Sequence, residues 1–558
     1  MKIKSFNLVF WAVMAWVLGS HQSYSANILA FITDHSPSHC IIQKTLLKAL
    51  VNRGHNVTLV SMCSTKPTIK TMPNFHELHL TEKNVFLKDF RSELSAKIKN
   101  SDPQGSTLSD AITSLKINAQ SAHDALEDPV TRSLLNSGQK FDLFILGWTY
   151  NDFLLGIAAH FKCPSIVLHT VATTKTIRDL VASPTAIESN QASAIVHRQT
   201  EITFRKRLSF WWEHIVEFVM IELYDHFVLR PYYNQHFPVA QNYPSYSDVK
   251  RNVSLVFVGH HFSQGAIRPN VPNLIEIGGI QIKNQPDPLP PTIDEFLRNA
   301  TDHGAILFSL GTNVNSTDFA SEKLEAILQV FAGLQQSVIW KWEGDEIPRN
   351  KSNNVLMVKW MPQDDILAHP NIRLFVSHCG LGGVTEALFH GVPILGIPFI
   401  YDQHMNANKI AEEGWSIHLP YDNITVHSFS SAVNAMLSNR TYSMRVKELS
   451  KLYRDRPQTA LDTAIYWTEY VLRHSGAPHM QTPQVQMNFF QRNSLDVVAF
   501  LVLLVVVGYN VIRFLLLRMS AAKLIVILGL FLYVDKVYQF IAVDIIVSAI
   551  RVNEAWCK

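Results

Sequence analysis

Short apolar runs alternate with longer amphipathic stretches through most of the chain, which is the pattern of strands and helices taken in turn. The first unit comprises a predicted strand at Asn27–Ile32, a helix over Cys40–Val51 and a second strand at Asn56–Ser61. Further strands are predicted at Asp142–Leu146 and Ser165–Leu168, on either side of the helical stretch Phe153–His160. Because strands that alternate with helices pair in parallel, this half of the chain is predicted to be an α/β domain.

A proline-rich break at residues 284–291 separates this series from a second one. Its strands are predicted at Ala305–Leu310, Ser337–Trp342, Val355–Lys359, Ile372–Ser377 and Pro393–Pro398, and helical patterns follow between Ser428 and Arg473. We therefore expect two Rossmann-like domains, residues 26–283 and 292–475, joined by a linker over residues 284–291. The carboxyl ends of their strands should face a common cleft, where ligands bind in such folds.

The N-terminus has the pattern of a secretory signal peptide over residues 1–25. Lys2 and Lys4 precede the apolar run Phe6–Leu18, and small residues follow near Ser25. An N-terminal membrane anchor is the alternative, although the run is short for a span.

A second apolar region near the C-terminus predicts a transmembrane helix over residues 495–517. Basic residues lie at its far end and beyond, at Arg513, Arg518 and Lys523. The positive-inside rule then places the long N-terminal part in the lumen of the endoplasmic reticulum, with type I topology. The tail, residues 518–558, holds two shorter apolar runs, predicted either as a kinked second span or as membrane-surface helices.

Residues 177–246 are rich in aromatic side chains, among them Trp211, Trp212 and Phe227. Helices with an apolar surface are expected here. Three interpretations stay open, namely ordinary core, an acceptor pocket, or contact with a membrane.

Net charge and cysteine spacing bear on whether the protein binds nucleic acid or a metal. The net charge of +3 gives no indication of a nucleic-acid partner. The five cysteines are widely spaced, so they show no metal-ligand spacing and do not require a disulfide framework. The sequons at Asn56, Asn252, Asn299, Asn315, Asn350, Asn423 and Asn439 are candidate glycosylation sites and agree with a lumenal location.

The stretch from Trp360 to Gln403 holds the richest set of chemical groups. His378 follows a predicted strand, and Gly382 and Gly383 come before a helix expected to begin at about Val384. Such a turn lets backbone N–H groups approach an anion, which predicts a phosphate site.

Other groups in this stretch suit the rest of a nucleotide sugar. Glu386 is suited to ribose hydroxyls, and Asp402 and Gln403 to the hydroxyls of a sugar. Trp360 offers a flat face for a base. Together these residues predict a nucleotide-sugar site.

Three motifs resemble the UDP-glycosyltransferase family of animals and plants, namely Ser309–Thr312, Trp360–Gln363 and the run from His378 to Gln403. The resemblance covers the whole chain in outline and is strongest to the insect-type members. It implies two Rossmann-like domains facing a cleft, the GT-B type of glycosyltransferase fold, plus a C-terminal transmembrane helix.

The resemblance implies a role for each matching residue of the donor site. Trp360 is expected to stack on uracil, Gln363 to hold the uridine and Glu386 to bind ribose. The diphosphate is expected to contact Thr312, His378 and the backbone at Gly380, Gly382 and Gly383, and the sugar to contact Asp402 and Gln403. Two departures stand out, because Cys379 occupies a position that is usually glycine and Gly382 one where vertebrate members carry asparagine.

The catalytic base is expected in the first domain. Ser38 is predicted to cap the helix after the first strand, so that His39 lies at the helix mouth and faces the cleft. An imidazole there can accept a proton near pH 7. The family places its base in a matching serine-histidine step, so His39 is the predicted base and His35 the second choice.

Family members pair this histidine with a carboxylate that steadies the imidazolium. Gly147 stands where vertebrate members have the aspartate. Asp152 is the nearest alternative and fits the asparagine-aspartate step of insect-type members, whereas a solvated helix cap is the other interpretation.

The resemblance implies an inverting transfer of a sugar from a UDP-sugar to a hydroxyl of a small lipophilic acceptor, a reaction typical of detoxification. UDP-glucose is the expected donor and acts as a co-substrate, and no metal or other cofactor is expected. A homo-oligomer is possible. The alternative is a non-catalytic protein of the endoplasmic reticulum membrane that binds nucleotide sugars or acts as a scaffold, supported by the departures at Gly147 and Gly382.

Overall fold

The structure is a computed structural model that describes residues 25–63, 72–81, 85–100, 108–185, 203–265, 267–300, 302–400, 402–518 and 521–556. The chain divides into two compact units, one up to Val485 and one from Gln486 onward. The predicted signal peptide, apart from Ser25, lies outside the described residues.

The first sheet has seven strands in the order β3-β2-β1-β4-β5-β6-β7. All six strand pairs are parallel. The strands are β1 (Asn27–Ile32), β2 (Asn56–Ser61), β3 (Phe75–His79), β4 (Leu143–Gly147), β5 (Ser165–His169), β6 (Val253–Val258) and β7 (Leu274–Glu276). The order reverses direction between β1 and β4, which is the switch point where doubly wound sheets bind ligands.

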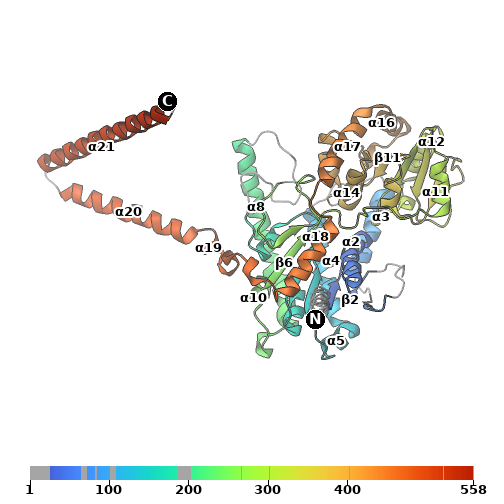
Figure 1. The fold of residues 1–558 in the computed structure, drawn as a ribbon, viewed down its shortest axis with the longest axis horizontal. Coiled ribbons are helices and arrows are strands. Elements are labelled where there is room, and N and C mark those ends of the chain that lie inside the picture. Colours follow the sequence, from blue (N-terminus) through green and yellow to red (C-terminus); the bar gives the residue numbers. More distant parts are fainter. Residues whose placement is uncertain are drawn as a thin grey trace, which may run out of the picture. The chain divides into compact units, whose positions relative to one another are not determined.

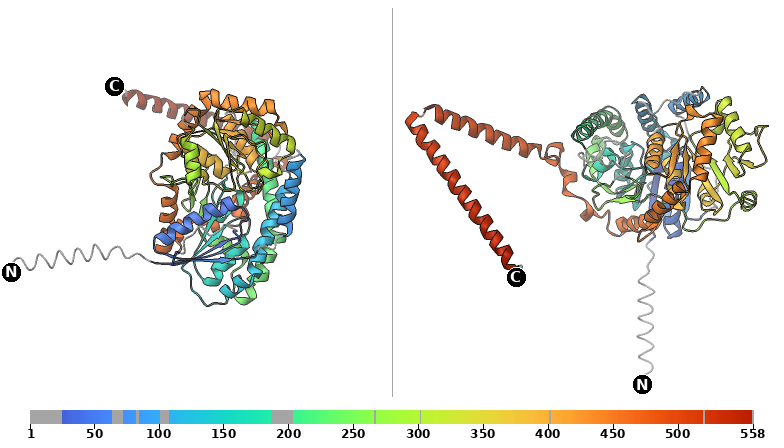
Figure 2. Two further views of the ribbon diagram at one scale, coloured as in Figure 1. Left: turned by 90° about the vertical axis from the view of Figure 1, so that its right-hand side faces the viewer. Right: turned by 90° about the horizontal axis from the view of Figure 1, so that it is seen from above.

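The helices of the first domain connect these strands and cover the sheet (Figures 1 and 2). They are α2 (Pro37–Asn52), α3 (Val85–Lys99), α4 (Leu108–Glu127), α5 (Pro129–Leu135), α6 (Gly156–Phe161), α7 (Lys175–Leu180), α8 (Phe204–Tyr224), α9 (Arg230–His236) and α10 (Tyr246–Arg251). Short irregular turns η1 (Asp152–Leu155) and η2 (Asp225–Leu229) precede α6 and α9.

The second sheet has six parallel strands in the order β10-β9-β8-β11-β12-β13. The strands are β8 (Ala305–Ser309), β9 (Ser337–Lys341), β10 (Val355–Val358), β11 (Ile372–Ser377), β12 (Ile394–Gly396) and β13 (Ser416–His418). The helices are α11 (Pro291–Arg298), α12 (Ser321–Ala332), α13 (Gln363–Leu367), α14 (Leu381–His390), α15 (Gln403–Glu412), α16 (Val426–Ser438) and α17 (Arg440–Arg454). The predicted pair of parallel α/β domains is thereby confirmed, and the sequence predicts most strands to within two residues.

Helix α18 (Ala460–Arg473) belongs by packing to the first domain, although the sequence assigned it to the second. Its residues Ala460, Ala464 and Val471 are buried in the same core as Ile28 and Leu46. Figure 1 shows it beside β6 and α2. The chain thus returns to the first domain after it has completed the second.

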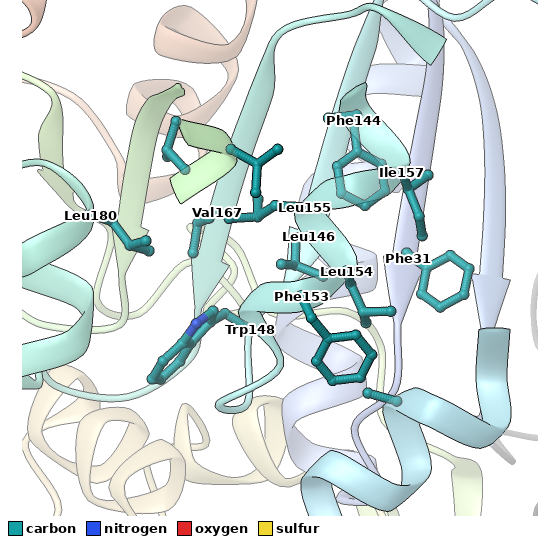
Figure 3. Close-up of a cluster of buried hydrophobic side chains, with 14 of the residues drawn as sticks. Phe31, Phe144, Leu146, Trp148, Phe153, Leu154, Leu155, Ile157, Val167 and Leu180 are labelled. Atoms are coloured by element: carbon teal, nitrogen blue, oxygen red, sulfur yellow. The ribbon is translucent and has the colours of Figure 1, made fainter. Parts of the chain in front are cut away.

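Large apolar side chains fill the face of the first sheet that α6 and the neighbouring turn η1 cover. Figure 3 shows Phe144, Leu146 and Val167 from β4 and β5 against Phe153 and Ile157. All five are at most 1% exposed. Burial of this many apolar side chains fixes β4 and the loop that follows it, next to the cleft.

A disulfide joins Cys40 in the first turn of α2 to Cys63 just after β2. The sequence did not predict this disulfide, because two cysteines 23 residues apart do not form the regular spacing of a disulfide-rich domain. The bond ties the start of α2 to the neighbouring strand. Cys163 and Cys379 are buried free cysteines.

The predicted glycosylation asparagines are mostly at the surface. Asn252, Asn299, Asn315, Asn350, Asn423 and Asn439 are exposed. Asn56 begins β2, is half-buried and donates a hydrogen bond to Asn27 Oδ1 (3.0 Å). Asn315 also lines the cleft described below.

The second unit consists of α19 (Phe489–Arg492), α20 (Leu495–Arg518) and α21 (Ala521–Trp556). Helix α20 and the segment Ile525–Val547 of α21 are long and apolar enough to cross a membrane. The sequence left the tail as two short runs, broken at Asp535 and Lys536. The structure instead makes the tail one continuous helix, since neither residue breaks helical geometry.

Candidate active site

A cavity of about 770 Å³ opens at the carboxyl ends of both sheets, between the two domains. Asn313 crosses it and donates to Ser36 Oγ (3.4 Å). The structure brings together in its lining His39 and the predicted donor-site residues Thr312, Trp360, Gln363, His378, Gly380, Gly382, Gly383, Glu386, Asp402 and Gln403. Asp152 is not among the lining residues.

His39 lies in the first turn of α2, which begins at Pro37 with Ser36 as its N-cap. The sequence predicted a later start, with Ser38 as the cap. Proline favours the first helical position, and this moves the helix start forward. His39 therefore projects from a rigid helix end instead of a loop.

The carboxylate partner of His39 is Asp34, in the loop after β1. His39 Nδ1 and Asp34 Oδ2 are 2.6 Å apart. The Asp34 carboxylate also accepts from the backbone N–H of Ser36 (2.9 Å), which fixes its orientation. The hydrogen bond commits Nδ1 to Asp34 and leaves Nε2 as the free acceptor.

Two opposing effects act on the pKa of His39. Burial lowers it, but the charge of Asp34 and the hydrogen bond to Asp34 outweigh burial, so the pKa of His39 is raised above its ordinary value. Burial alone would raise the pKa of Asp34, yet the charge of His39 and the hydrogen bonds lower it. The pair therefore favours an imidazolium beside a carboxylate.

Asp152, the predicted partner of His39, is placed elsewhere. Its carboxylate is fully buried, accepts a hydrogen bond from Trp148 Nε1 and lies 3.7 Å from Lys250 Nζ. Burial raises its pKa, against the charge of Lys250. The pairing predicted from the asparagine-aspartate step is wrong, because η1 turns this side chain into the domain interior toward Lys250 of α10.

Gly147 ends β4, next to Gln43 of α2. A Cβ atom at Gly147 would lie 2.5 Å from Gln43 Oε1. The buried amide of Gln43 thus fills the space that a side chain at position 147 would need. His35, the second choice for the base, bonds Ser121 Oγ of α4 through Nε2.

The N-terminus of α14 faces the cavity and begins at Leu381, three residues before the predicted start. Gly380 is its N-cap, without a side-chain hydrogen bond. Gly382 and Gly383 thus lie in the first turn, where backbone N–H groups have no partner inside the helix. This end of α14 can bind an anion.

His378 stands beside that helix end. Its ring is held between Gly311 and Gly380, since a Cβ atom at either glycine would lie 2.5 Å from it. Burial and then the charge of Lys341 lower the pKa of His378 to about 4, so the imidazole is neutral at pH 7. Its Nδ1 is buried and has no hydrogen-bond partner among the described residues.

Lys341 is a cation that the sequence analysis did not select. It ends β9, lines the cavity, and donates to Gly311 O (2.6 Å) and Glu343 Oε1 (2.8 Å). Lys341 ends a strand, as Thr312 and His378 follow the ends of neighbouring strands. Because ligands bind at the carboxyl ends of parallel strands, this position could have marked Lys341 as a candidate site residue.

Glu386 lies one turn into α14 and is joined to two glutamines. Gln363 Nε2 donates to its Oε2 (2.7 Å), and Gln281 Nε2 lies 3.4 Å from its Oε1. Burial raises the pKa of Glu386 to about 7, against the hydrogen bond from Gln363. Trp360, by contrast, is 62% exposed, so its ring is accessible to a flat ligand.

Asp402 is the N-cap of α15. The charges of Asp402 and His39 interact, and each shifts the pKa of the other side chain. Its carboxylate accepts from Asn406 Nδ2 (2.7 Å). Gln403 uses its Oε1 to accept from the backbone N–H groups of Phe399 (2.9 Å) and Ile400 (3.1 Å). This bond fixes the loop that carries Asp402.

Cys379 has a backbone conformation that favours glycine. Its φ is +62°, in the left-handed region that glycine adopts without cost. The backbone is held there by a bond from Cys379 N–H to Ser377 Oγ (3.1 Å) and one from Asn406 Nδ2 to Cys379 O (3.0 Å). The thiol is buried, and burial raises its pKa, which disfavours the thiolate.

The opposite wall of the cavity is more apolar and comes from the first domain. Its apolar members are Ile41, Ile42, Leu94, Ile98 and Ile117, from α2, α3 and α4. Leu94 and Ile98 also belong to the core of the second domain, so α3 bridges the two domains. The cavity therefore combines a polar donor side with an apolar wall next to His39.

Comparison with known proteins gives a family match over most of the chain. Residues 26–527 match the family described as UDP-glucoronosyl and UDP-glucosyl transferase. UDP-glycosyltransferase UGT5 of Dactylopius coccus is 33% identical over 486 residues, which cover 87% of this chain and 90% of that protein. UDP-glucosyltransferase 2 of the same insect is 33% identical over 89% of this chain and 93% of its own length.

More distant relatives and solved structures agree with the fold. Human UDP-glucuronosyltransferase 1A10 is 28% identical over 84% of this chain and 87% of its own length. A UDP-glucosyltransferase from Polygonum tinctorium, solved with 3,4-dichloroaniline, superposes with a TM-score of 0.53 at 14% identity, over 81% of this chain and 99% of that one. The structure of the glycotransferase of kitacinnamycin gives a TM-score of 0.52 at 17% identity, over 81% of this chain and all of that one.

Proposed function

Because this UDP-glycosyltransferase belongs to the family of UDP-glucoronosyl and UDP-glucosyl transferases, we propose that it transfers glucose from UDP-glucose to a hydroxyl of a small lipophilic acceptor, with inversion at the anomeric carbon. The observation that carries the proposal is the His39–Asp34 pair, which opens onto the same cavity as the N-terminus of α14.

His39 acts as the general base in this reaction. Its Nε2 takes the proton of the acceptor hydroxyl while the oxygen attacks the anomeric carbon, and the bond from that carbon to the UDP oxygen breaks. Asp34 is a positioning residue, because it holds Nδ1–H and stabilises the imidazolium that forms. The attack comes from the face opposite UDP, so an α-linked donor gives a β-glycoside.

The donor side holds UDP through matched groups. Trp360 stacks on uracil, Gln363 positions the uridine and Glu386 accepts from the ribose hydroxyls. The diphosphate binds the N–H groups at the start of α14, with Thr312, His378 and Lys341 beside it. These donors stabilise the charge that develops on the leaving UDP, and the reaction needs no further cofactor.

Glucose is favoured over glucuronate by the charge around the sugar position. Asp402 lines the cavity there, on the side formed by the second domain, whose described lining residues include no arginine; Arg91, which also lines the cavity, comes from α3 on the side formed by the first domain. A glucuronate carboxylate would therefore meet an acidic neighbour instead of a bidentate cation. The apolar wall of α2, α3 and α4 suits a lipophilic acceptor next to His39.

We further propose that the protein is an anchored glycoprotein of the endoplasmic reticulum membrane, with its catalytic unit in the lumen and a role in detoxification. The disulfide Cys40–Cys63 supports an oxidising compartment. The basic start of the chain, the exposed sequons and the apolar helix α20 agree with entry into the secretory pathway.

A transfer assay on membranes that hold the whole chain tests the proposed reaction. It offers UDP-glucose, UDP-glucuronate and UDP-galactose with a panel of phenols and sterols, and NMR of the product gives the anomeric configuration. We expect a β-glucoside. Preferential transfer of glucuronate, or an α-linked product, would overturn the proposal.

A further inference from the structure

Helix α8 carries its apolar side chains on the outside of the protein. Phe204, Leu208, Trp211, Trp212, Ile215, Val216, Val219 and Leu223 are each between 42% and 71% exposed. They recur every three or four residues, so they form one stripe along the helix. We call this set the α8 stripe.

The opposite face of α8 already packs against the domain. Phe210 and His214 are buried there, and His214 Nδ1 bonds the Phe210 carbonyl (2.7 Å). A surface helix of a water-exposed domain normally turns its apolar face inward and its polar face outward. The inner face of α8 is thus already occupied by the domain, so the α8 stripe on its outer face needs a separate partner that is itself apolar.

Charged groups flank the α8 stripe. Arg205, Lys206 and Arg207 follow one another at its N-terminal end and are exposed. Arg230 lies beyond its C-terminal end, 3.8 Å from Asp225 Oδ2, and Phe227, which is 68% exposed, extends the stripe toward it. The helix of 21 residues is about 30 Å long, so apolar and basic groups are spread along a line.

This combination fits the surface of a lipid bilayer. Tryptophan is favoured at the boundary between headgroups and acyl chains, and arginine and lysine attract anionic headgroups. The same chain carries α20, whose length and composition suit a membrane span. A membrane-spanning α20 would tether the chain to a bilayer.

We propose that α8 lies on the membrane surface, with the α8 stripe inserted shallowly among the lipids and the basic residues against the headgroups. The site is separate from the cavity, because no residue of α8 lines it. Figure 1 shows α8 on a flank of the first domain, on the opposite side from α11 and α12 of the second. The inference is independent of which sugar or acceptor the enzyme uses.

Contact with lipid can be measured on the whole chain in nanodiscs. A bimane fluorophore is attached to the Trp212→Cys variant, in a Cys557→Ser background, and the discs contain phospholipid brominated in the acyl chains. The matched control carries the label at Met444→Cys on α17, a position that is 69% exposed. Both positions are on the surface, so labelling should leave the fold intact, which UDP binding verifies.

We expect the label at position 212 to lose about half of its fluorescence, because an interfacial helix inserts its apolar face roughly 5–10 Å, within reach of the bromines. The label at position 444 should lose none. Equal quenching at both positions, or none at 212, would overturn the proposal. A spectral shift at 212 that depends on a second protein copy per disc, without quenching by lipid, would also overturn it and assign the α8 stripe to self-association.

The basic flank gives a second readout. Quenching at position 212 should increase when anionic lipid replaces zwitterionic lipid, and Arg205→Glu with Arg207→Glu should abolish that increase. The matched charge change Arg440→Glu on α17 should leave it in place. An increase that survives the double change would contradict the proposed role of these arginines.

Discussion

The raised pKa of His39 depends mainly on one neighbouring residue, Asp34, with a smaller contribution from the charge of Asp402. Burial by itself would lower the pKa of His39, and the carboxylate 2.6 Å away reverses that shift. A base must be deprotonated to act, so the rate falls as the pH drops through the raised pKa. The acid limb of kcat/KM should therefore lie above the ordinary histidine value of about 6.5.

The Asp34→Asn variant tests this dependence. The amide keeps the shape but removes the charge, so the acid limb should move to lower pH while the maximal kcat falls by about 10²-fold or more. Rate profiles between pH 5 and 9 measure both effects. An unchanged profile would show that Asp34 does not act through His39.

Asp152 should behave as a structural residue. Asp152→Ala removes the hydrogen-bond acceptor of Trp148 and one of the two carboxylate partners of Lys250. Lys250 still has its ion pair with Asp225, at 2.9 Å. We expect a loss of about 2–3 kcal/mol in the free energy of unfolding, and a smaller loss for Asp152→Asn, whose oxygen still accepts from Trp148. Chemical denaturation measures the loss. A shifted pH profile for Asp152→Asn, at unchanged stability, would restore this residue to the active site.

Lys341 should contribute to the binding of the diphosphate and not to the binding of the nucleoside. Lys341→Met removes the charge beside His378, so affinity for UDP should fall about tenfold or more, the equivalent of one charge-assisted hydrogen bond. Affinity for uridine should stay the same. Calorimetry with the two ligands separates these effects, and equal losses for both would indicate a general disturbance of the site.

Much of the site can be predicted from the sequence, because strand ends and glycine turns mark where ligands approach the backbone. The residues around Trp360, His378 and Glu386 follow this rule. Asp34 does not, since a loop residue five positions before the base carries no pattern. Its contact with His39 depends on the start of α2 at Pro37, and element boundaries are the least predictable feature of a sequence.

Helix α2 shows how one element links stability to chemistry. It carries His39 in its first turn and is tied to the end of β2 through Cys40 and Cys63. Parallel strands such as β1 and β11 follow from their continuous apolar runs. The disulfide does not follow, because the proximity of its cysteines arises only when β1 and β2 pair.

Removal of the disulfide should destabilise the first domain. A loop of this length contributes about 3 kcal/mol through the entropy of the unfolded chain, so Cys40→Ala with Cys63→Ala should lower the unfolding midpoint. Thermal unfolding with and without reductant measures it. The double variant supplies the control, since reductant should lower the midpoint of the natural sequence only. A natural protein insensitive to reductant would contradict this role of the bond.

The whole molecule combines two parallel-sheet domains with a unit of apolar helices. The cavity of the two domains has the His39–Asp34 pair on one side and the N-terminus of α14 on the other. The domain plan follows from the two series of strands and the break at residues 284–291. The return of α18 to the first domain does not, because a helical pattern states which face is apolar but not which domain it covers. For the same reason, the sequence did not show whether the apolar side chains of α8 pack inside the domain, line a pocket or contact a membrane.

His39 is the proposed base of a glucosyl transfer at this cavity. The most direct measurement compares turnover of UDP-glucose by the natural sequence and by His39→Ala, with the affinity for UDP determined on both. We predict that kcat falls by about 10²–10⁴-fold while UDP affinity stays the same, since the proposed partner of His39 is the acceptor and not the nucleotide. Equal turnover by the two proteins would exclude His39 as the catalytic base.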